Sequence, residues 1–70
     1  MPLTMANPNK EMHITAIHSS HDVRMRLCNL GFTAGIPVRI ISRNPSSLLV
    51  GIRDTRIMLD FKIAHQIHVQ

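Results

Sequence analysis

Aromatic residues are almost absent from this 70-residue chain, which has no tryptophan, no tyrosine and only two phenylalanines, Phe32 and Phe61. We expect both phenylalanines to lie in a core that is otherwise aliphatic. Small barrels that bind single-stranded nucleic acid stack the bases on exposed aromatic side chains. Phosphate contacts from basic residues would then be the main source of any nucleic-acid affinity. We therefore do not expect a nucleic-acid partner, and a small nucleic-acid-binding barrel remains an alternative function.

Cysteine is equally scarce, because Cys28 is the only one in the chain. A single cysteine excludes an internal disulfide and fits a reducing compartment. We expect Cys28 to be a small buried or half-buried hydrophobic residue on the flank of a helix. No stretch approaches the ~20 apolar residues that span a bilayer, and residues 1–8 lack the features of a signal peptide. The sequence predicts a soluble, cytoplasmic protein.

The combinations of residues that support catalysis are also missing. The four acidic residues are scattered along the chain. Ser46 and Ser47 stand in a turn without the glycine-rich elbow that exposes a nucleophilic serine. Gly31 and Gly35 follow a helix, whereas a phosphate-binding glycine loop opens one. We therefore predict that the protein is not an enzyme.

Histidine is comparatively frequent, with five residues in the chain. His18 and His21 are three positions apart, and so are His65 and His68. Zinc normally takes three or four protein ligands, so two histidines do not make a site. We expect surface and strand-end histidines and no cofactor. A weak surface site for a transition metal, bridging two molecules, is the alternative.

The charge balance is basic, with eight lysines and arginines against four acidic residues and a net charge of +4. An acidic protein partner, a nucleic acid or an anionic membrane surface would each be compatible with this charge. Solubility alone favours a net charge of this size on a small domain. The charge therefore restricts the class of partner without identifying it.

Alternating apolar residues predict five short strands and little helix. An extended N-terminal arm is expected over residues 1–9, with a turn at Pro8-Asn9, because asparagine tolerates the left-handed conformation better than most residues. Five short strands in one domain, residues 1–70, predict a mainly β fold that curls into a small barrel, because closure removes exposed sheet edges. The strands are expected over residues 12–18, 36–43, 48–53, 56–60 and 67–69, with a single helical turn over 61–66.

One short amphipathic helix is expected between the first two strands. Its start is indicated by Ser19 to Asp22, which supply a cap and an acidic first turn. Val23, Leu27 and Leu30 are spaced to form one apolar stripe. Gly31 then stands where a helix ends in a left-handed conformation.

The order of these features resembles the FeoA family, the small ferrous iron transport protein A of bacteria. The central resemblance consists of Arg26-Leu27, Leu30-Gly31-Phe32, Gly35, Val38-Arg39-Ile40-Ile41 and Asn44-Pro45. Outside it, further similar positions are Leu3, Pro8-Asn9, Ile14, Arg56-Ile57-Met58-Leu59, Ala64 and Ile67-His68-Val69. The chain departs from the family at Asn9, at the shorter loop from Pro45 to Leu48, and at Asp60, where a basic residue is common.

The resemblance implies an SH3-like barrel and a role in ferrous iron uptake beside FeoB, a membrane permease with a cytoplasmic GTPase domain. Similar barrels also form the C-terminal domains of metal-dependent repressors, but this chain has no helix-turn-helix. We therefore expect a free-standing accessory that binds the cytoplasmic part of FeoB and is held near the inner membrane by it. A metal-binding or metal-responsive module is the alternative function.

The expected contact surface is the exposed side of the helix together with the turn that follows it. An exposed methionine between two arginines is a plausible contact for a partner, and a basic, partly apolar patch suits an acidic one. The residues predicted for this surface are Arg24, Met25, Thr33, Ala34, Gly35 and Arg43.

Overall fold

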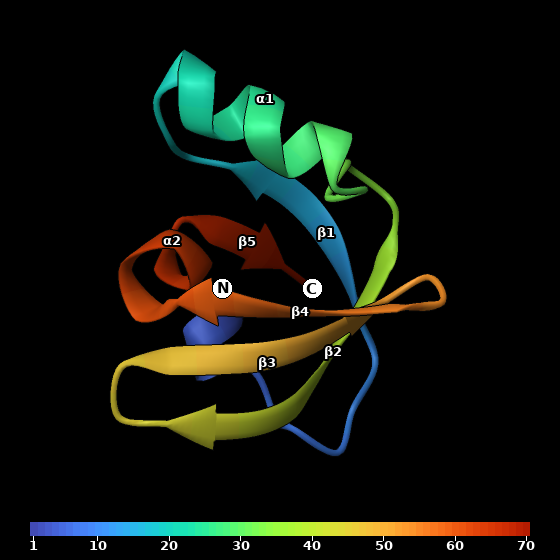
Figure 1. The fold of residues 1–70 in the computed structure, drawn as a ribbon. Helices are drawn as coiled ribbons and strands as arrows, with labels where there is room; N and C mark the ends of the chain where they lie inside the picture. The colour runs from blue at the N-terminus through green and yellow to red at the C-terminus, as the bar shows by residue number, and fades with distance from the viewer.

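The computed structural model describes all 70 residues, and its main element is a five-stranded antiparallel sheet in the order β4-β3-β2-β1-β5 (Figure 1). This confirms the predicted mainly β class, and each strand begins and ends within one residue of its expected bounds. The strands are β1 (Met12–Ile17), β2 (Pro37–Asn44), β3 (Ser47–Ile52), β4 (Thr55–Asp60) and β5 (Ile67–Val69). The helices are the 3-10 turn η1 (Leu3–Met5), α1 (His21–Asn29) and α2 (Phe61–His65).

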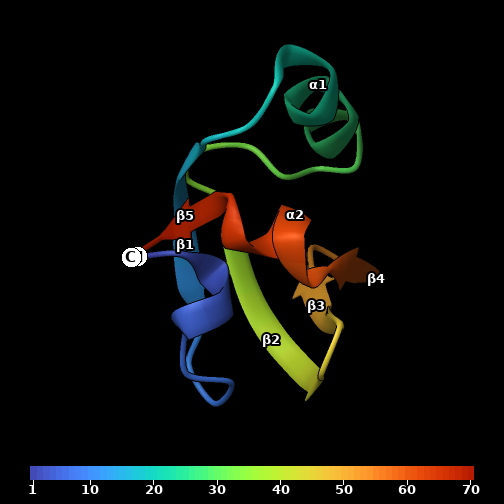
Figure 2. The ribbon, with the colours of Figure 1, turned by 90° about the vertical axis from the view of Figure 1, so that its left-hand side faces the viewer.

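The two edges of the sheet, β4 and β5, are not hydrogen-bonded to each other, so the barrel is not closed by strand pairing. Figure 2 shows α2 between these two edge strands, where it fills the gap. The free side of β5 is covered instead by the N-terminus, since Pro2 bridges to His68 and the Val69 N–H donates to the Met1 carbonyl over 2.7 Å. The chain thus shields one edge with its own first residues.

The core fills the interior of the curled sheet and is almost entirely aliphatic, as expected. Strand β3 contributes Leu48, Val50 and Ile52 from one face, at spacings of two residues. Phe32 is the one aromatic member and is fully buried. The other core residues are Leu3, Ala6, Met12, Ile14, Leu27, Val38, Ile40, Leu59, Ala64, Ile67 and Val69.

The prediction that Phe61 lies in the core is wrong, because its side chain is 44% exposed. It is the first residue of α2, whose start is fixed by Asp60, since the Asp60 Oδ1 accepts from the Lys62 N–H at 2.7 Å. This helix turns Ala64 toward the core and leaves Phe61 outside, stacked on His65 with ring centroids 6.3 Å apart. One aromatic ring therefore lies at the surface, although both phenylalanines are expected in the core from the sequence.

The prediction of an extended arm over residues 1–9 is also wrong. Leu3–Met5 make the 3-10 turn η1, and the side chains of Leu3 and Ala6 are buried in the core. The turn at Pro8-Asn9 is present, but Asn9 has no positive φ. Asn7 organises it, because its Oδ1 accepts from the Asn9 N–H at 2.9 Å. Apolar side chains and this local hydrogen bond explain why the segment folds back on the sheet.

Helix α1 begins and ends as the sequence predicts. Ser20 caps it, with its Oγ accepting from the Val23 N–H at 3.3 Å. At the other end Gly31 adopts a φ of +106°, its N–H donates to the Cys28 carbonyl and the Phe32 N–H to the Leu27 carbonyl, both at 2.9 Å. These are the two bonds of a Schellman motif, in which the residue after the glycine packs back on the last helical turn.

The predicted apolar stripe of α1 is wrong at Leu30. Leu27 is buried and Val23 is partly buried, but Leu30 is 51% exposed. Leu30 is the C-cap, and the Schellman turn brings Phe32 into the core beside Leu27 in its place. Only one residue of α1 is therefore fully buried. No helix of the chain is long and apolar enough to cross a membrane.

Candidate functional site

An apolar cleft with a volume of about 300 Å³ separates α1 from β1. Figure 2 shows α1 standing above the curled sheet, joined to it by the segments before and after the helix. Seven of the nine residues that line the cleft are hydrophobic. The lining consists of Ile14, Ala16, Ile17, Arg24, Met25, Cys28, Phe32, Thr33 and Ala34.

The loop after α1 forms one wall of the cleft and is fixed against β1 by main-chain hydrogen bonds. The Gly35 N–H donates to the Ile14 carbonyl at 2.7 Å, and the Ile14 N–H donates to the Ile36 carbonyl at 3.0 Å. Gly35 has a φ of +88°, a conformation that a side chain would disfavour. The turn is thus held in place while Thr33 and Ala34 face the cleft.

Four of the six predicted contact residues come together in this cleft: Arg24, Met25, Thr33 and Ala34. Met25 is 48% exposed, as the sequence suggested. The Arg24 guanidinium makes one long hydrogen bond, 3.5 Å, to the Ser19 carbonyl near the start of α1. Gly35 is exposed next to the cleft without lining it.

Arg43 lies apart from the other five predicted residues, near the end of β2. Its Nη1 donates to the Thr4 carbonyl at 2.6 Å and its Nη2 to the Ala6 carbonyl at 2.5 Å. The guanidinium therefore satisfies two main-chain acceptors of the N-terminal segment and ties that segment to the sheet. Its contacts in the structure are internal ones.

Most of the residues that line the cleft were not predicted from the sequence. Cys28 is exposed and carries a free thiol at the cleft, which corrects the expectation that it is buried or half-buried. The other missed lining residues are Phe32, after α1, and Ile14, Ala16 and Ile17 of β1. The available signal was the apolar character of both faces of this strand, which indicates that a further element covers its second face.

The histidines are brought together in a different pairing from the one that their spacing suggested. The rings of His18 and His68 stack with centroids 4.2 Å apart, and Thr4 Oγ1 shares a hydrogen bond of 2.8 Å with His65 Nδ1. Desolvation, and then the charges of His18, the N-terminal amine and His65, lower the pKa of His68. No group of three or more His, Cys, Asp or Glu side chains is placed to hold one metal ion.

The fold is shared with several solved proteins. An iron uptake regulatory protein described as FeoA has 20% identity and a TM-score of 0.90, with 100% of this chain and 95% of that chain covered. A manganese-dependent transcriptional repressor has 14% identity and a TM-score of 0.86, with 96% of this chain and 39% of that chain covered. Among curated proteins, none matches the chain.

The FeoA of Stenotrophomonas maltophilia, solved in complex with zinc, has 26% identity and a TM-score of 0.88, with 100% of this chain and 89% of that chain covered. It is described as a prokaryotic SH3 domain protein, which agrees with the SH3-like fold predicted here. A sequence model described as FeoA domain matches residues 1–70. The chain therefore belongs to the FeoA domain family, which is associated with ferrous iron transport.

Proposed function

We propose that this protein is a non-enzymatic accessory of ferrous iron uptake that binds the cytoplasmic, GTPase-containing part of a FeoB-type permease through the cleft between α1 and β1. The family supports the pathway, and the Stenotrophomonas relative is described as a candidate ferrous iron transport activating factor. The cleft is the single observation that carries the proposed contact, because it gathers four residues expected at the partner surface.

The chemistry of the cleft suits a protein partner. Methionine adapts its shape to different apolar surfaces, and methionine and arginine are both enriched in protein interfaces. Met25 and Arg24 stand side by side at the cleft, so one partner segment could insert an apolar side chain and place a carboxylate near the guanidinium. A volume of about 300 Å³ is enough for one or two such side chains.

The position of α1 suits this role as well. Its single fully buried residue is Leu27, so most of the helix surface is free to contact a partner. The Schellman turn and the hydrogen bond from the Gly35 N–H to Ile14 hold the segment after α1 in place against β1. A preformed surface of this kind reduces the conformational entropy that binding would cost.

The test is a titration of the chain against the purified cytoplasmic domain of the permease at about 50 and about 200 mM salt. The double variant Arg24→Glu with Met25→Ala should weaken binding at least about tenfold. Wild-type affinity should fall with salt, because exposed charges are screened.

The matched control is Arg26→Glu with Leu30→Ala, which makes the same kinds of change on α1 outside the cleft. We expect this control to bind within about threefold of wild type. Equal losses in both double variants would show that the cleft is not the contact. If the wild type does not bind at all, the proposed partner is wrong.

A metal-binding module is the second candidate, favoured by the stacked rings of His18 and His68. The lowered pKa of His68 favours the neutral imidazole, which is the form that ligates metals. Two ligands from one chain would leave further positions to a second molecule or to water. Calorimetric titration with zinc should then show saturable binding that His68→Gln removes and His13→Gln, an exposed histidine outside the pair, does not. A flat titration at micromolar zinc would exclude this candidate.

A further inference from the structure

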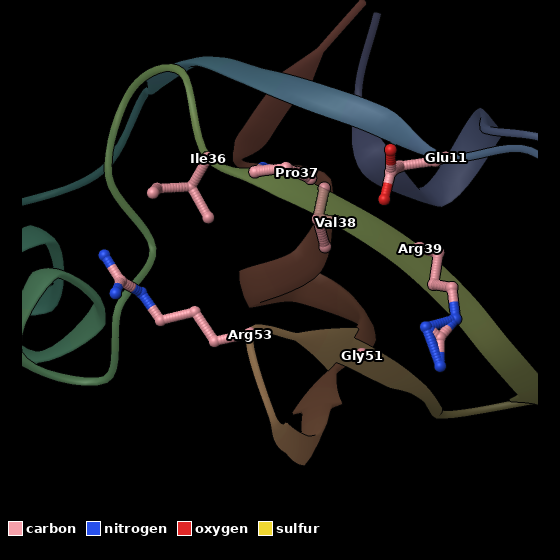
Figure 3. A pocket seen from close by; sticks show the side chains of 7 residues that line it. All are labelled: Glu11, Ile36, Pro37, Val38, Arg39, Gly51 and Arg53. Carbon is pink, nitrogen blue, oxygen red and sulfur yellow. The ribbon is translucent and has the colours of Figure 1, made fainter.

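A second cavity, of about 310 Å³, lies beside β2 and the turn between β3 and β4, and shares no lining residue with the α1–β1 cleft. Only two of its seven lining residues are hydrophobic. Figure 3 shows Arg39 and Arg53 on opposite sides of it, with Ile36, Pro37 and Val38 along its length. The cavity therefore combines polar and apolar surface, with an arginine at each end.

The two arginines of the cavity differ from Arg24 and Arg43, but not from Arg26 and Arg56, in making no side-chain hydrogen bond. The guanidinium groups of Arg24 and Arg43 donate to main-chain carbonyls. Arg39 and Arg53 are exposed, and neither guanidinium is engaged in a hydrogen bond within the chain. Their planar forks are free to bind carboxylate or phosphate oxygens, for which their geometry is suited.

Gly51 gives the first sign that the cavity is adapted to this use. It is a buried glycine in the interior of β3, directly opposite Arg39 on β2. A Cβ at Gly51 would come within 3.1 Å of Arg39 Nη1 and 3.2 Å of its Cζ. A glycine weakens a strand and often marks a close approach, and here it lets the guanidinium lie across the strand.

Arg53 gives the second sign. It is the first residue of the two-residue turn between β3 and β4, and its φ is +52°, the one positive φ outside glycine. Glycine or asparagine would occupy this conformation with less strain. Gly51 and Arg53 thus each weaken the local structure, and both line the same cavity, which is the pattern expected where a binding site is maintained.

We infer that this cavity binds a small anion with two carboxylate or two phosphate groups, one held by Arg39 and the other by Arg53. Two separated cations favour a divalent ligand over a monovalent one, because each charged group gains its own guanidinium. No aromatic side chain lines the cavity, so it offers no stacking surface for a nucleobase. The cavity volume, about 310 Å³, is at the lower end of the range for small-molecule sites.

The test is an NMR titration of the ¹⁵N-labelled full chain with succinate, with pyrophosphate and with acetate, all at equal ionic strength. The amide signals of Arg39, Gly51 and Arg53 should shift and saturate at millimolar concentrations of succinate or of pyrophosphate. Acetate should bind at least about tenfold more weakly. The divalent probe that saturates first identifies the ligand as a dicarboxylate or a diphosphate.

Three variants examine the cavity itself. Arg39→Gln should weaken binding about tenfold, and Gly51→Ala should weaken it while keeping both arginines, because the new Cβ displaces the Arg39 guanidinium. Arg53→Gly should lose affinity while its melting temperature is no lower than that of wild type, since glycine relieves the positive φ. A loss of affinity without a loss of stability cannot be attributed to misfolding.

Glu11 lies at the rim of the cavity, and its substitution should strengthen anion binding where the other variants weaken it. Its carboxylate stands on the Arg39 side of the cavity (Figure 3) and would repel an anion. Glu11→Gln should therefore tighten binding about twofold to threefold. The control is Arg26→Gln, which removes an arginine from α1, away from the cavity.

Three outcomes would overturn the inference. One is that neither divalent probe saturates by about 20 mM. Another is that acetate binds as well as succinate and pyrophosphate do. The last is that Arg26→Gln weakens binding as much as Arg39→Gln, which would mean that the probes respond only to the net positive charge of the chain.

Discussion

The two helical regions of this molecule are anchored to the sheet to very different degrees. At one end η1 and α2 are packed into the core, where Leu3 and Ala64 are fully buried. On the other side α1 buries only Leu27 fully and leaves a cleft of about 300 Å³ beneath it. The packed end closes the barrel, whereas the open side leaves surface for binding.

Polar contacts follow the same division. At the packed end Arg43 binds two carbonyls of the N-terminal segment, and Thr4 shares a hydrogen bond with His65. At the open side Arg24 makes a single long hydrogen bond to Ser19. Because a satisfied and partly buried hydrogen bond stabilises more than an exposed one, the comparison predicts that equivalent substitutions cost more at the packed end.

The largest effect should come from Phe32, which together with Leu27 anchors the open side to the core. Phe32→Ala should lower the free energy of unfolding by about 4 kcal/mol, because the ring is fully buried next to Leu27. Phe61→Ala at the start of α2 should cost less than about 1 kcal/mol, because that ring is 44% exposed. Urea unfolding followed by circular dichroism measures both, and similar losses would contradict the burial described here.

The next effect concerns the packed end. Leu3→Ala should lower the free energy of unfolding by about 3 kcal/mol, because the residue is 0% exposed in the core. Its neighbour Met5 is 68% exposed, and Met5→Ala should change stability by less than about 0.5 kcal/mol. If Leu3→Ala unfolds at the urea concentration of the wild type, the N-terminal segment is not part of the core in solution.

A smaller effect compares two arginines. Arg43→Gln should lower the free energy of unfolding by about 1–2 kcal/mol, because two partly buried carbonyls lose a charged donor. Arg24→Gln should leave it within about 0.5 kcal/mol, since its hydrogen bond is long and exposed. Chemical denaturation of the two variants under one set of conditions would decide the comparison, and a larger loss for Arg24→Gln would reverse it.

The smallest effect is a dependence on pH at the packed end. The pKa of His68 in the folded chain is below its ordinary value of 6.5 because of desolvation, His18, the N-terminal amine and His65. The unfolded chain therefore binds the proton first, and stability falls as the pH drops below about 6.5. His68→Gln should lose less of its melting temperature than wild type between about pH 7.5 and about pH 5. An unchanged pH dependence would mean that His68 does not contribute.

Much of the fold could be predicted from the sequence, because its signals are local. The alternation in Leu48, Val50 and Ile52 identifies a strand, and Gly31 ends the helix since it can adopt a positive φ. Leu30 and Phe61 show the limit of such reasoning. Both are apolar residues at element ends, where one turn of the chain decides whether a side chain faces the core or the solvent.

The candidate site was predictable in part. Arg24 and Met25 were recognisable from their place off the apolar stripe, and the loop after Gly31 from its sequence. The facing wall, from Ile14 to Ile17, could not be assigned to the same cleft because it belongs to another element. Arg43 has the same residue type as Arg24 but a different role, since the N-terminal segment folds back onto it.

The sequence by itself determined the succession of strands along the chain, the short helix with its cap and its final glycine, the aliphatic composition of the core and the basic charge. These features depend on composition or on residues within a few positions of one another. Only the tertiary structure decided which distant residues meet: His18 with His68, Arg39 with Gly51, and α1 with the face of β1. The reason is that such pairs depend on the register and the curl of the sheet, and all five strands together determine both.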